Sequence, residues 1–246
     1  MRENYTLPRL YLAAALGQAQ TIELEKAQAH YLGTVLRKSN GDSLRVFNGE
    51  HGEWQAEVTD LSRKGGRLIC SAQIRPQHDC PDIWMCFAPV RKHRNSFILE
   101  KGTELGARRF QPVLTAHTQF PKMNLGKARA QIIEAAEQTE RLDLPELRAG
   151  VTLAELLSGW DKKRKLIFAD EAGDARPAQD ALGDSANSSP SAAILIGPEG
   201  GFSSDERARL RAESYVVPVS LGPRILRADT AALALLSLWQ AHRGDW

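Results

Sequence analysis

The strongest constraint on the fold is a change in sequence rhythm at residues 76–82, Pro-Gln-His-Asp-Cys-Pro-Asp. Two prolines among polar residues are typical of a linker, because proline interrupts both helices and strands. Short, partly alternating apolar segments precede this linker, whereas longer apolar and amphipathic segments follow it. The rhythm therefore predicts two domains, residues 1–75 and 83–246, joined at 76–82.

The first domain is predicted to consist mainly of strands. Segments 43–47, 53–58 and 67–74 are short, partly alternate apolar with polar residues, and are separated by turns that contain glycine. One short helix is expected over 25–37, where apolar residues recur at helical spacing. This combination favours a small β-barrel domain.

The second domain is predicted to alternate strands with helices. Glu155 lies three residues after Thr152, and Glu206 lies three residues after Ser203, which is the spacing of a capping box at a helix start. Gly, Ala, Ser, Asp and Pro dominate residues 170–191, which we interpret as a surface loop. The alternation favours a parallel sheet covered on both faces, an α/β architecture. The expected strands are 83–90, 110–114, 166–169, 192–196 and 216–221, and the expected helices are 95–106, 125–142, one from 152, one from 203, and 230–242.

Composition excludes several classes of protein. Hydrophobic residues make up 42% and charged residues 25% of the chain, as in ordinary globular proteins. Neither a run of about 18 apolar residues nor a signal-peptide core after Met1 is present, so we expect a cytoplasmic protein without a membrane partner. The cysteines, Cys70, Cys80 and Cys86, form no close pair, and the six histidines are scattered. We therefore expect reduced thiols and no metal site.

Charge is distributed unevenly along the chain. Residues 1–130 contain 19 Lys and Arg against 12 Asp and Glu, whereas residues 131–246 contain 13 against 18. A basic half can face a polyanion such as nucleic acid. A solvated surface of mixed charge explains the same counts, so the charge distribution alone leaves both interpretations open.

Two loops in the second domain carry the candidate chemistry. The first, Ile196-Gly-Pro-Glu-Gly-Gly-Phe-Ser203, follows a buried strand at the edge where parallel sheets bind ligands. Its glycines allow the backbone to approach a ligand closely. It matches neither G-x-G-x-x-G nor the P-loop pattern, so a phosphate cradle is not supported. A tight turn followed by a helix cap explains the glycines equally well.

The second loop, Ser220-Leu-Gly-Pro-Arg-Ile-Leu-Arg-Ala-Asp-Thr-Ala-Ala232, leads into an apolar helix. Arg227 in this loop is placed either to meet an anionic or developing negative group, or to pair with Asp229. Asp229 or Thr230 is expected to cap the helix.

Together these loops resemble those of the 16S ribosomal RNA (uracil-N3)-methyltransferases of the SPOUT superfamily. Three further segments resemble signatures of the same family and occur in the same order: His30-Tyr-Leu-Gly-Thr-Val-Leu-Arg37, Glu100-Lys-Gly-Thr-Glu-Leu-Gly106 and Glu134-Ala-Ala-Glu-Gln-Thr-Glu-Arg141. The matches run from about residue 8 to 232, nearly the whole chain. Two departures stand out, because Asp229 replaces the usual Glu, and Arg91-Lys-His-Arg94 lacks the family's Asp.

The resemblance implies an N-terminal PUA-like RNA-binding barrel and a C-terminal α/β-knotted methyltransferase domain, with a trefoil knot and a parallel sheet. It implies S-adenosylmethionine as cofactor, 16S ribosomal RNA or the assembled small ribosomal subunit as partner, and a homodimer. The cofactor would be held by both loops and the start of the last helix. The residues carried over to this site are Ile196, Gly197, Pro198, Glu199, Gly200, Gly201, Leu221, Gly222, Ile225, Leu226, Thr230 and Ala231.

The implied activity is methylation of N3 of a specific uridine in small-subunit ribosomal RNA. Arg227 is the candidate catalytic residue, because a guanidinium near the uracil carbonyl oxygens stabilises the charge that develops as N3 loses its proton. Glu199 and Asp229 are possible bases, and neither is assigned. The alternatives are a SPOUT ribose 2′-O-methyltransferase acting on transfer or ribosomal RNA, and a non-catalytic RNA-binding factor in ribosome assembly. The predicted contacts to RNA phosphates are Arg9, Arg37, Arg91, Lys92 and Arg94.

Overall fold

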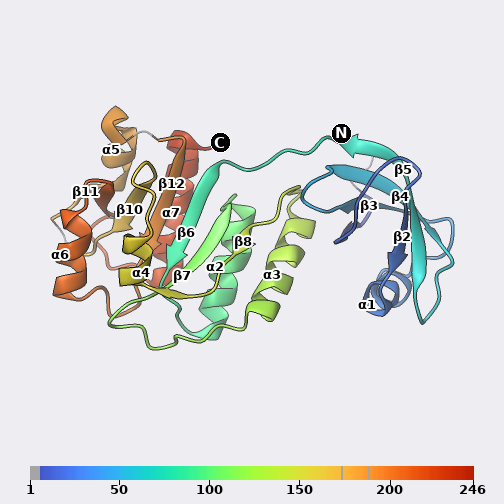
Figure 1. The fold of residues 1–246 in the computed structure, drawn as a ribbon, viewed down its shortest axis with the longest axis horizontal. Coiled ribbons are helices and arrows are strands. Elements are labelled where there is room, and N and C mark those ends of the chain that lie inside the picture. The colour runs from blue at the N-terminus through green and yellow to red at the C-terminus, as the bar shows by residue number, and fades with distance from the viewer. Residues whose placement is uncertain (1–5, 173, 188) are drawn as a thin grey trace. The chain divides into compact units, whose positions relative to one another are not determined.

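The computed structural model describes residues 6–172, 174–187 and 189–246 (Figure 1). The chain divides into two compact units. The first contains the residues up to Asp79 together with Ala136–Asp143, and the second contains Cys80–Ala135 and Leu144–Trp246. This division differs from the predicted one at residues 136–143, which the sequence places in the second domain.

The first unit is built on a five-stranded sheet in the order β1-β3-β4-β5-β2. Strands β1 and β3 pair in parallel, and the other pairs are antiparallel. A short helix, α1, runs directly into a π-helical turn, and together they cover the predicted helix at 25–37; Ala29 and Leu32 are buried against the sheet. The predicted strands are confirmed. The elements are β1 (Arg9–Tyr11), β2 (Thr21–Leu24), α1 (Lys26–His30), the π turn (Tyr31–Val35), β3 (Ser43–Phe47), β4 (Glu53–Thr59) and β5 (Gly66–Arg75).

Buried arginines explain why residues 136–143 belong to the first unit. Arg9 is 6% exposed, and its Nε donates to Glu53 Oε1 at 2.6 Å. Its remaining nitrogens donate to the carbonyl oxygens of Ala136 at 2.6 Å and Arg141 at 2.9 Å. Arg45 donates to Glu140 Oε2 at 2.7 Å. Arg9 thus takes up a carbonyl oxygen of the last turn of α3 (Leu125–Gln138), which ends earlier than the predicted helix at 125–142.

The second unit contains an eight-stranded parallel sheet, as predicted. Its strand order is β11-β13-β10-β12-β6-β7-β8, and β9 pairs with β7. The central strands β10, β12 and β6 are almost wholly apolar, as expected for strands that are buried on both faces. The strands are β6 (Asp82–Phe87), β7 (Arg109–Leu114), β8 (Glu146–Leu147), β9 (Val151–Thr152), β10 (Lys165–Ala169), β11 (Arg176–Pro177), β12 (Ser191–Ile196) and β13 (Val216–Ser220).

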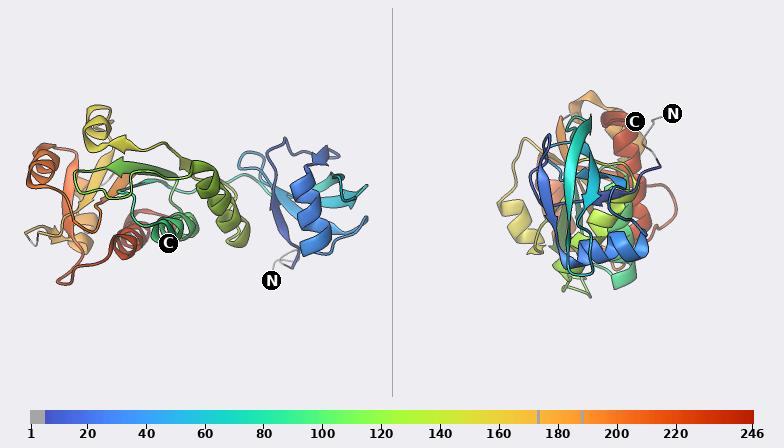
Figure 2. Two further views of the ribbon diagram at one scale, coloured as in Figure 1. Left: turned by 90° about the horizontal axis from the view of Figure 1, so that it is seen from below. Right: turned by 90° about the vertical axis from the view of Figure 1, so that its right-hand side faces the viewer.

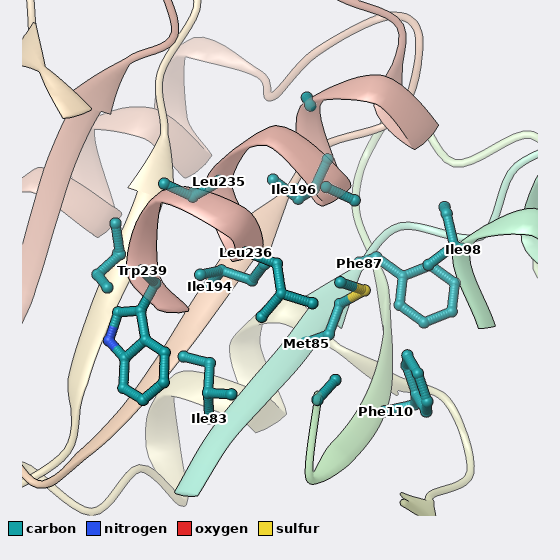
Figure 3. Packing of buried hydrophobic residues seen from close by; sticks show 14 of the residues in the cluster. Ile83, Met85, Phe87, Ile98, Phe110, Ile194, Ile196, Leu235, Leu236 and Trp239 are labelled. Atoms are coloured by element: carbon teal, nitrogen blue, oxygen red, sulfur yellow. The ribbon is translucent and has the colours of Figure 1, made fainter. Parts of the chain in front are cut away.

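Helices cover both faces of this sheet, and side chains alternate between the two cores. Ile194 and Ile196 of β12 enter the core on the side of α2 and α7, whereas Ala193 and Leu195 enter the core on the side of α4 and α6. Figure 2 shows these helices on opposite sides of the sheet, and Figure 3 shows α7 packing on β6 and β12. The helices are α2 (Lys92–Glu104), α3, α4 (Leu153–Ser158), α5 (Ala178–Gly183), α6 (Ser204–Ala212) and α7 (Ala228–Arg243). No helix in the described ranges is long and apolar enough to cross a membrane.

Local signals at helix starts have mixed outcomes. Both predicted capping boxes are confirmed, since Glu155 N donates to Thr152 Oγ1 at 3.1 Å and Glu206 N donates to Ser203 Oγ at 3.2 Å. The prediction that Asp229 or Thr230 caps the last helix is wrong. The N-cap is Arg227, so both residues already lie inside the first turn of α7.

The predicted surface loop at 170–191 also needs correction. It contains β11, α5 and a 3₁₀ turn at Ser185–Asn187. Ala178, Ala181 and Leu182 are buried, and their spacing places them on one side of α5. A helix of six residues is too short for its apolar residues to show a helical period in the sequence. The polar, small-residue composition of this segment therefore led to the wrong prediction of a loop.

Candidate functional site

Both glycine-containing loops border one cavity in the second unit, at the carboxyl ends of β10, β12 and β13. Its volume is about 420 Å³, which lies within the usual range of about 300–1,000 Å³ for small-molecule sites. Parallel sheets bind ligands at this edge. The lining residues are Ala169, Asp170, Glu171, Ala175, Pro177, Ile196, Gly197, Pro198, Glu199, Phe202, Val219, Ser220, Leu221, Gly222, Pro223, Arg224, Ile225, Leu226, Ala228 and Ala231.

The structure brings together most of the residues predicted to hold the cofactor. Those that line the cavity are Ile196, Gly197, Pro198, Glu199, Leu221, Gly222, Ile225, Leu226 and Ala231. Gly200, Gly201 and Thr230 are not among the lining residues. The carbonyl oxygen of Gly200 instead lies 2.9 Å from Nδ1 of His117, and a Cβ at Gly200 would lie 3.3 Å from the His117 Cβ.

The backbone of both loops leaves little choice of residue at three glycines. A Cβ on Gly197 would come within 2.7 Å of the Phe202 ring, and one on Gly201 would collide with the Glu171 carboxylate. Gly201 has φ +66° and Gly222 has φ +101°, a region that residues with a side chain rarely adopt. Gly197 and Gly222 therefore shape the cavity wall directly, and Gly201 leaves room for the Glu171 side chain, which lines it.

Sequence reasoning missed the part of the cavity formed by the segment after β10. Asp170 is buried, and its carboxylate accepts hydrogen bonds from Arg207 Nε and Arg211 Nε, each at 2.8 Å. Burial by itself would raise the pKa of Asp170, but these two hydrogen bonds, together with one from Ala172 N and the charge of Arg207, outweigh it, and the pKa lies below its ordinary value. The available signal was the position of Asp170 directly after a buried strand, at the same sheet edge as the two loops.

Glu171 is the second carboxylate of this segment, and its surroundings differ from those of Asp170. Burial raises the pKa of Glu171, and the negative charge of Asp170 acts in the same direction. Within the described ranges, the Glu171 side chain forms neither a hydrogen bond nor an ion pair. The cavity wall thus carries one acidic group that is free to meet a cationic ligand.

Arg227 lies at the edge of the cavity rather than in its wall. It is the N-cap of α7, and its carbonyl oxygen accepts from Ala231 N at 2.8 Å. Its neighbours Leu226 and Ala228 line the cavity. The Arg227 side chain is exposed and has neither an ion pair nor a hydrogen bond to any described residue, Asp229 included. Its guanidinium is therefore available to a ligand.

The predicted RNA contacts separate into three groups. The prediction for Arg9 needs correction, because its guanidinium is buried against Glu53 and three backbone carbonyl oxygens and is not accessible to a phosphate. Arg37, in the first unit, and Arg91 and Lys92, at the start of α2, are exposed. Arg94 is partly buried and pairs with Glu199 at 3.5 Å, so it contacts the cavity wall.

Comparison with known proteins decides the family. A model of an RNA methyltransferase domain matches residues 77–240, and a model of an RNA methyltransferase PUA domain matches residues 24–69. The chain is also 33% identical to ribosomal RNA small subunit methyltransferase E of Synechocystis over 220 residues, which is 88% of this chain and 72% of that protein. The chain belongs to this RNA methyltransferase family. The family and the two-part fold expected from the sequence are thereby confirmed, whereas the knot stays a prediction.

Solved structures of methyltransferases resemble the whole chain. A putative methyltransferase from Legionella pneumophila, in complex with the bound cofactor SAM, is 30% identical with a TM-score of 0.86; the match covers 98% of this chain and 99% of that one. A ribosomal RNA small subunit methyltransferase E from Neisseria gonorrhoeae, bound to S-adenosyl methionine, is 27% identical with a TM-score of 0.83, again covering 98% and 99%. Similarity of the complete chain means that both parts of the family's architecture are present.

Proposed function

We propose that this chain transfers the methyl group of S-adenosylmethionine to N3 of a uridine in small-subunit ribosomal RNA. The observation that carries the proposal is that both glycine-containing loops, within the part of the chain matched by the family model, border one cavity. Relatives named for methylation of small-subunit ribosomal RNA, and a similar structure that contains the cofactor, support the same assignment.

The residues of the cavity fit S-adenosylmethionine. Ile196, Leu221 and Leu226 offer apolar surface. The backbone at Gly222 is open to a planar ring, because no described atom beyond its chain neighbours lies within 4 Å of where its Cβ would be. The ligand is a cation, and Glu171 provides a carboxylate without an ion-pair partner among the described residues. Arg207 and Arg211 already neutralise Asp170, which leaves Glu171 as the unpaired carboxylate among the described lining residues.

The reaction needs groups that orient the uracil and stabilise charge. When bound, the cofactor supplies an electrophilic methyl group attached to a sulfonium. Arg227 is placed at the cavity edge, where its guanidinium can hold the uracil carbonyl oxygens as N3 loses its proton. It cannot act as the base, since it stays protonated at neutral pH. Glu199 is held by Arg94, and Asp229 lies in the first turn of α7, so neither is assigned as the base.

We further propose that the protein acts in the cytoplasm as a homodimer. Phe97 on α2 is 42% exposed, and Ile225 of the cavity lining is 89% exposed. Large apolar side chains at such positions are suited to contact with a second copy or with substrate.

The direct test is transfer of labelled methyl from S-adenosylmethionine to purified small ribosomal subunits and to protein-free 16S ribosomal RNA. We expect incorporation into one uridine, and mass spectrometry of the digested RNA to identify 3-methyluridine. A 2′-O-methylated ribose would instead support the alternative SPOUT activity. Binding of RNA without any transfer, at saturating cofactor, would support a non-catalytic assembly factor and refute the proposal.

A further inference from the structure

The second unit contains a second hollow, which has no lining residue in common with the cavity. Of its lining residues, Lys92 was predicted above to contact RNA. The volume of this hollow is about 630 Å³, and it is bordered by the start of α2, the segment before α3, and the first half of α3. The lining residues, which define the lysine groove, are Val90, Lys92, Asn95, Ser96, Leu99, Phe120, Lys122, Met123, Asn124, Lys127, Ala128, Ala130 and Gln131.

The charge of the lysine groove has one sign. Lys92, Lys122 and Lys127 line it, and no lining residue is acidic. All three side chains are exposed, and none forms an ion pair with a described residue. Three ammonium groups around one hollow repel each other, and a bound anion would offset this repulsion. The groove is therefore complementary to a ligand that carries several negative charges.

The basic residues occupy positions where they weaken the helices. The N-terminal end of a helix dipole is positive and favours acidic side chains. Neither α2 nor α3 has an acidic residue in its first turn; α2 starts Lys92-His93-Arg94, and Lys127 lies in the first turn of α3. A helix-stabilising sequence would place Asp or Glu at these positions. At α3 the Asn124 Oδ1 already accepts from Lys127 N at 2.9 Å, whereas α2 has no side-chain cap from any described residue, so its start favours an external anion.

An aromatic ring and an apolar floor complete the groove. Phe120 is 38% exposed, although a side chain of this size is usually buried. Val90, Leu99 and Ala128 are buried beneath the groove, and Asn95 fixes the start of α2 by exchanging two hydrogen bonds of 2.9 Å with the backbone of Val90. An aromatic ring next to lysine ammonium groups can stack on a nucleic-acid base while the lysines contact the neighbouring phosphates.

Two contacts link segments next to the lysine groove to the loop Ile196–Ser203, which borders the cavity. Arg94, which precedes groove residues Asn95 and Ser96, pairs with Glu199 of the cavity wall. His117, in the segment that leads to Phe120, lies 2.9 Å from the carbonyl oxygen of Gly200. The groove segments follow the carboxyl ends of β6 and β7, and the cavity lies at the carboxyl ends of β10, β12 and β13. Because all these strands are parallel, groove and cavity lie at the same edge of the sheet, and we expect an extended polymer to reach both.

We propose that the lysine groove binds a single-stranded segment of the substrate RNA next to the target nucleotide. Phosphates lie against Lys92, Lys122 and Lys127, and one unpaired base stacks on Phe120. The inference rests on the proposed function for the identity of the RNA. Sequence-specific recognition of RNA uses single strands whose bases are free to stack, which fits one exposed ring among cations.

A matched pair of double variants tests the electrostatic part. Lys122→Ser with Lys127→Ser removes two groove charges, and Lys162→Ser with Lys163→Ser removes two exposed charges of the same unit outside the groove. The groove variant should bind a 16S ribosomal RNA fragment roughly tenfold more weakly, and the slope of log K against log salt should fall by about 0.7 per lost contact. The control variant should bind as the unchanged protein does. Equal affinity and slope for all three proteins would overturn the proposal.

Variants of Phe120 test the stacking part. Phe120→Leu keeps an apolar side chain but removes the ring, and should weaken RNA binding about tenfold, whereas Phe120→Trp should restore it. Calorimetry with S-adenosylmethionine should give the same affinity for every variant, which shows that the cavity is intact. If Leu and Trp behave alike, the ring does not stack on a base and this part of the proposal is wrong.

Two further outcomes separate the groove from the proposed function. If the unchanged protein methylates ribosomal RNA and the groove variants bind RNA normally, the function stands and the groove proposal fails. If the unchanged protein transfers no methyl group yet its RNA binding depends on the groove, the function fails and the groove stands. A change of mass by light scattering in the groove variants, without a change in RNA binding, would identify the groove as a contact between copies.

Discussion

Arg227 carries the clearest consequence for catalysis at the scale of single residues. Arg227→Lys keeps the charge and loses the planar fork, and Arg227→Ala loses both. Loss of one donor that stabilises developing charge typically costs about 10²–10³ in turnover, and we expect this range for Arg227→Ala with a smaller loss for Arg227→Lys. Single-turnover methylation measures the effect. The exposed position predicts unchanged folding and unchanged affinity for S-adenosylmethionine. Full turnover of Arg227→Ala at saturating RNA would make Arg227 an RNA anchor instead.

Glu53 predicts the response of the first unit to acid. It is 1% exposed and accepts from Arg9 and from Arg75 Nε at 2.9 Å. Burial alone would raise the pKa of Glu53, but the hydrogen bonds and charges of the two arginines hold it below its ordinary value of 4.5. The stabilisation is therefore complete above pH 4.5 and disappears as the pH falls through the lower folded value.

Glu53→Gln checks this expectation. Leaving the buried arginines without their carboxylate should cost about 3–5 kcal/mol in the free energy of unfolding at pH 7. Denaturant unfolding should show the difference between variant and unchanged protein shrinking as the pH is lowered from 4.5. A difference that stays constant with pH would mean that Glu53 stabilises by packing alone.

The limits of sequence reasoning are clearest in these same residues. Arg9 and Arg91 look alike in a charge count, yet one is buried under residues 136–143 and the other is exposed. No local pattern distinguishes them, since the burial of Arg9 depends on a segment more than a hundred positions away. Nine of the twelve predicted cofactor residues line the cavity because loop motifs are local; Asp170 and Glu171 were missed because their segment carries no motif.

At the scale of elements, α7 positions one wall of the cavity. Ala231 is 8% exposed and lines it, whereas Ala234 on the same helix is only partly buried and does not. Ala231→Phe should fill the space and weaken cofactor binding at least tenfold, since overpacking of this kind costs about 1–3 kcal/mol. Ala234→Phe is the matched control and should bind normally in calorimetry. Equal affinities would show that the ligand does not reach this wall.

Elements with a strong period or a cap were predictable, and short ones were not. The parallel strands, α2 and the capped starts of α4 and α6 follow from apolar runs and from side-chain chemistry within four residues. Helix α5 escaped, because its few apolar positions lie within a polar, small-residue segment. The end of α3 was placed too late, because apolar spacing continues past Gln138, whereas Glu140 has φ +63° and Arg9, far away in the sequence, takes up the carbonyl oxygen of Ala136.

The whole molecule is expected to be a dimer. Light scattering at micromolar concentration should give twice the chain mass of 27.2 kDa. Phe97→Ser, which removes an exposed apolar side chain of α2, should shift the population toward the monomer. A single species of 27.2 kDa for the unchanged protein would contradict the dimer.

The segment 136–143 has a consequence for how the chain is made. All five strands of the first unit have left the ribosome once residue 75 is free, but Arg9 still lacks the carbonyl oxygens of Ala136 and Arg141, and Arg45 lacks Glu140. At about 5–20 residues per second, these partners follow several seconds later. By then β6, β7 and α3 of the second unit have also been synthesised. A nascent chain halted at Asp79 should thus be sensitive to proteolysis in its first unit, because residues 136–143, which complete this unit, have not yet been synthesised.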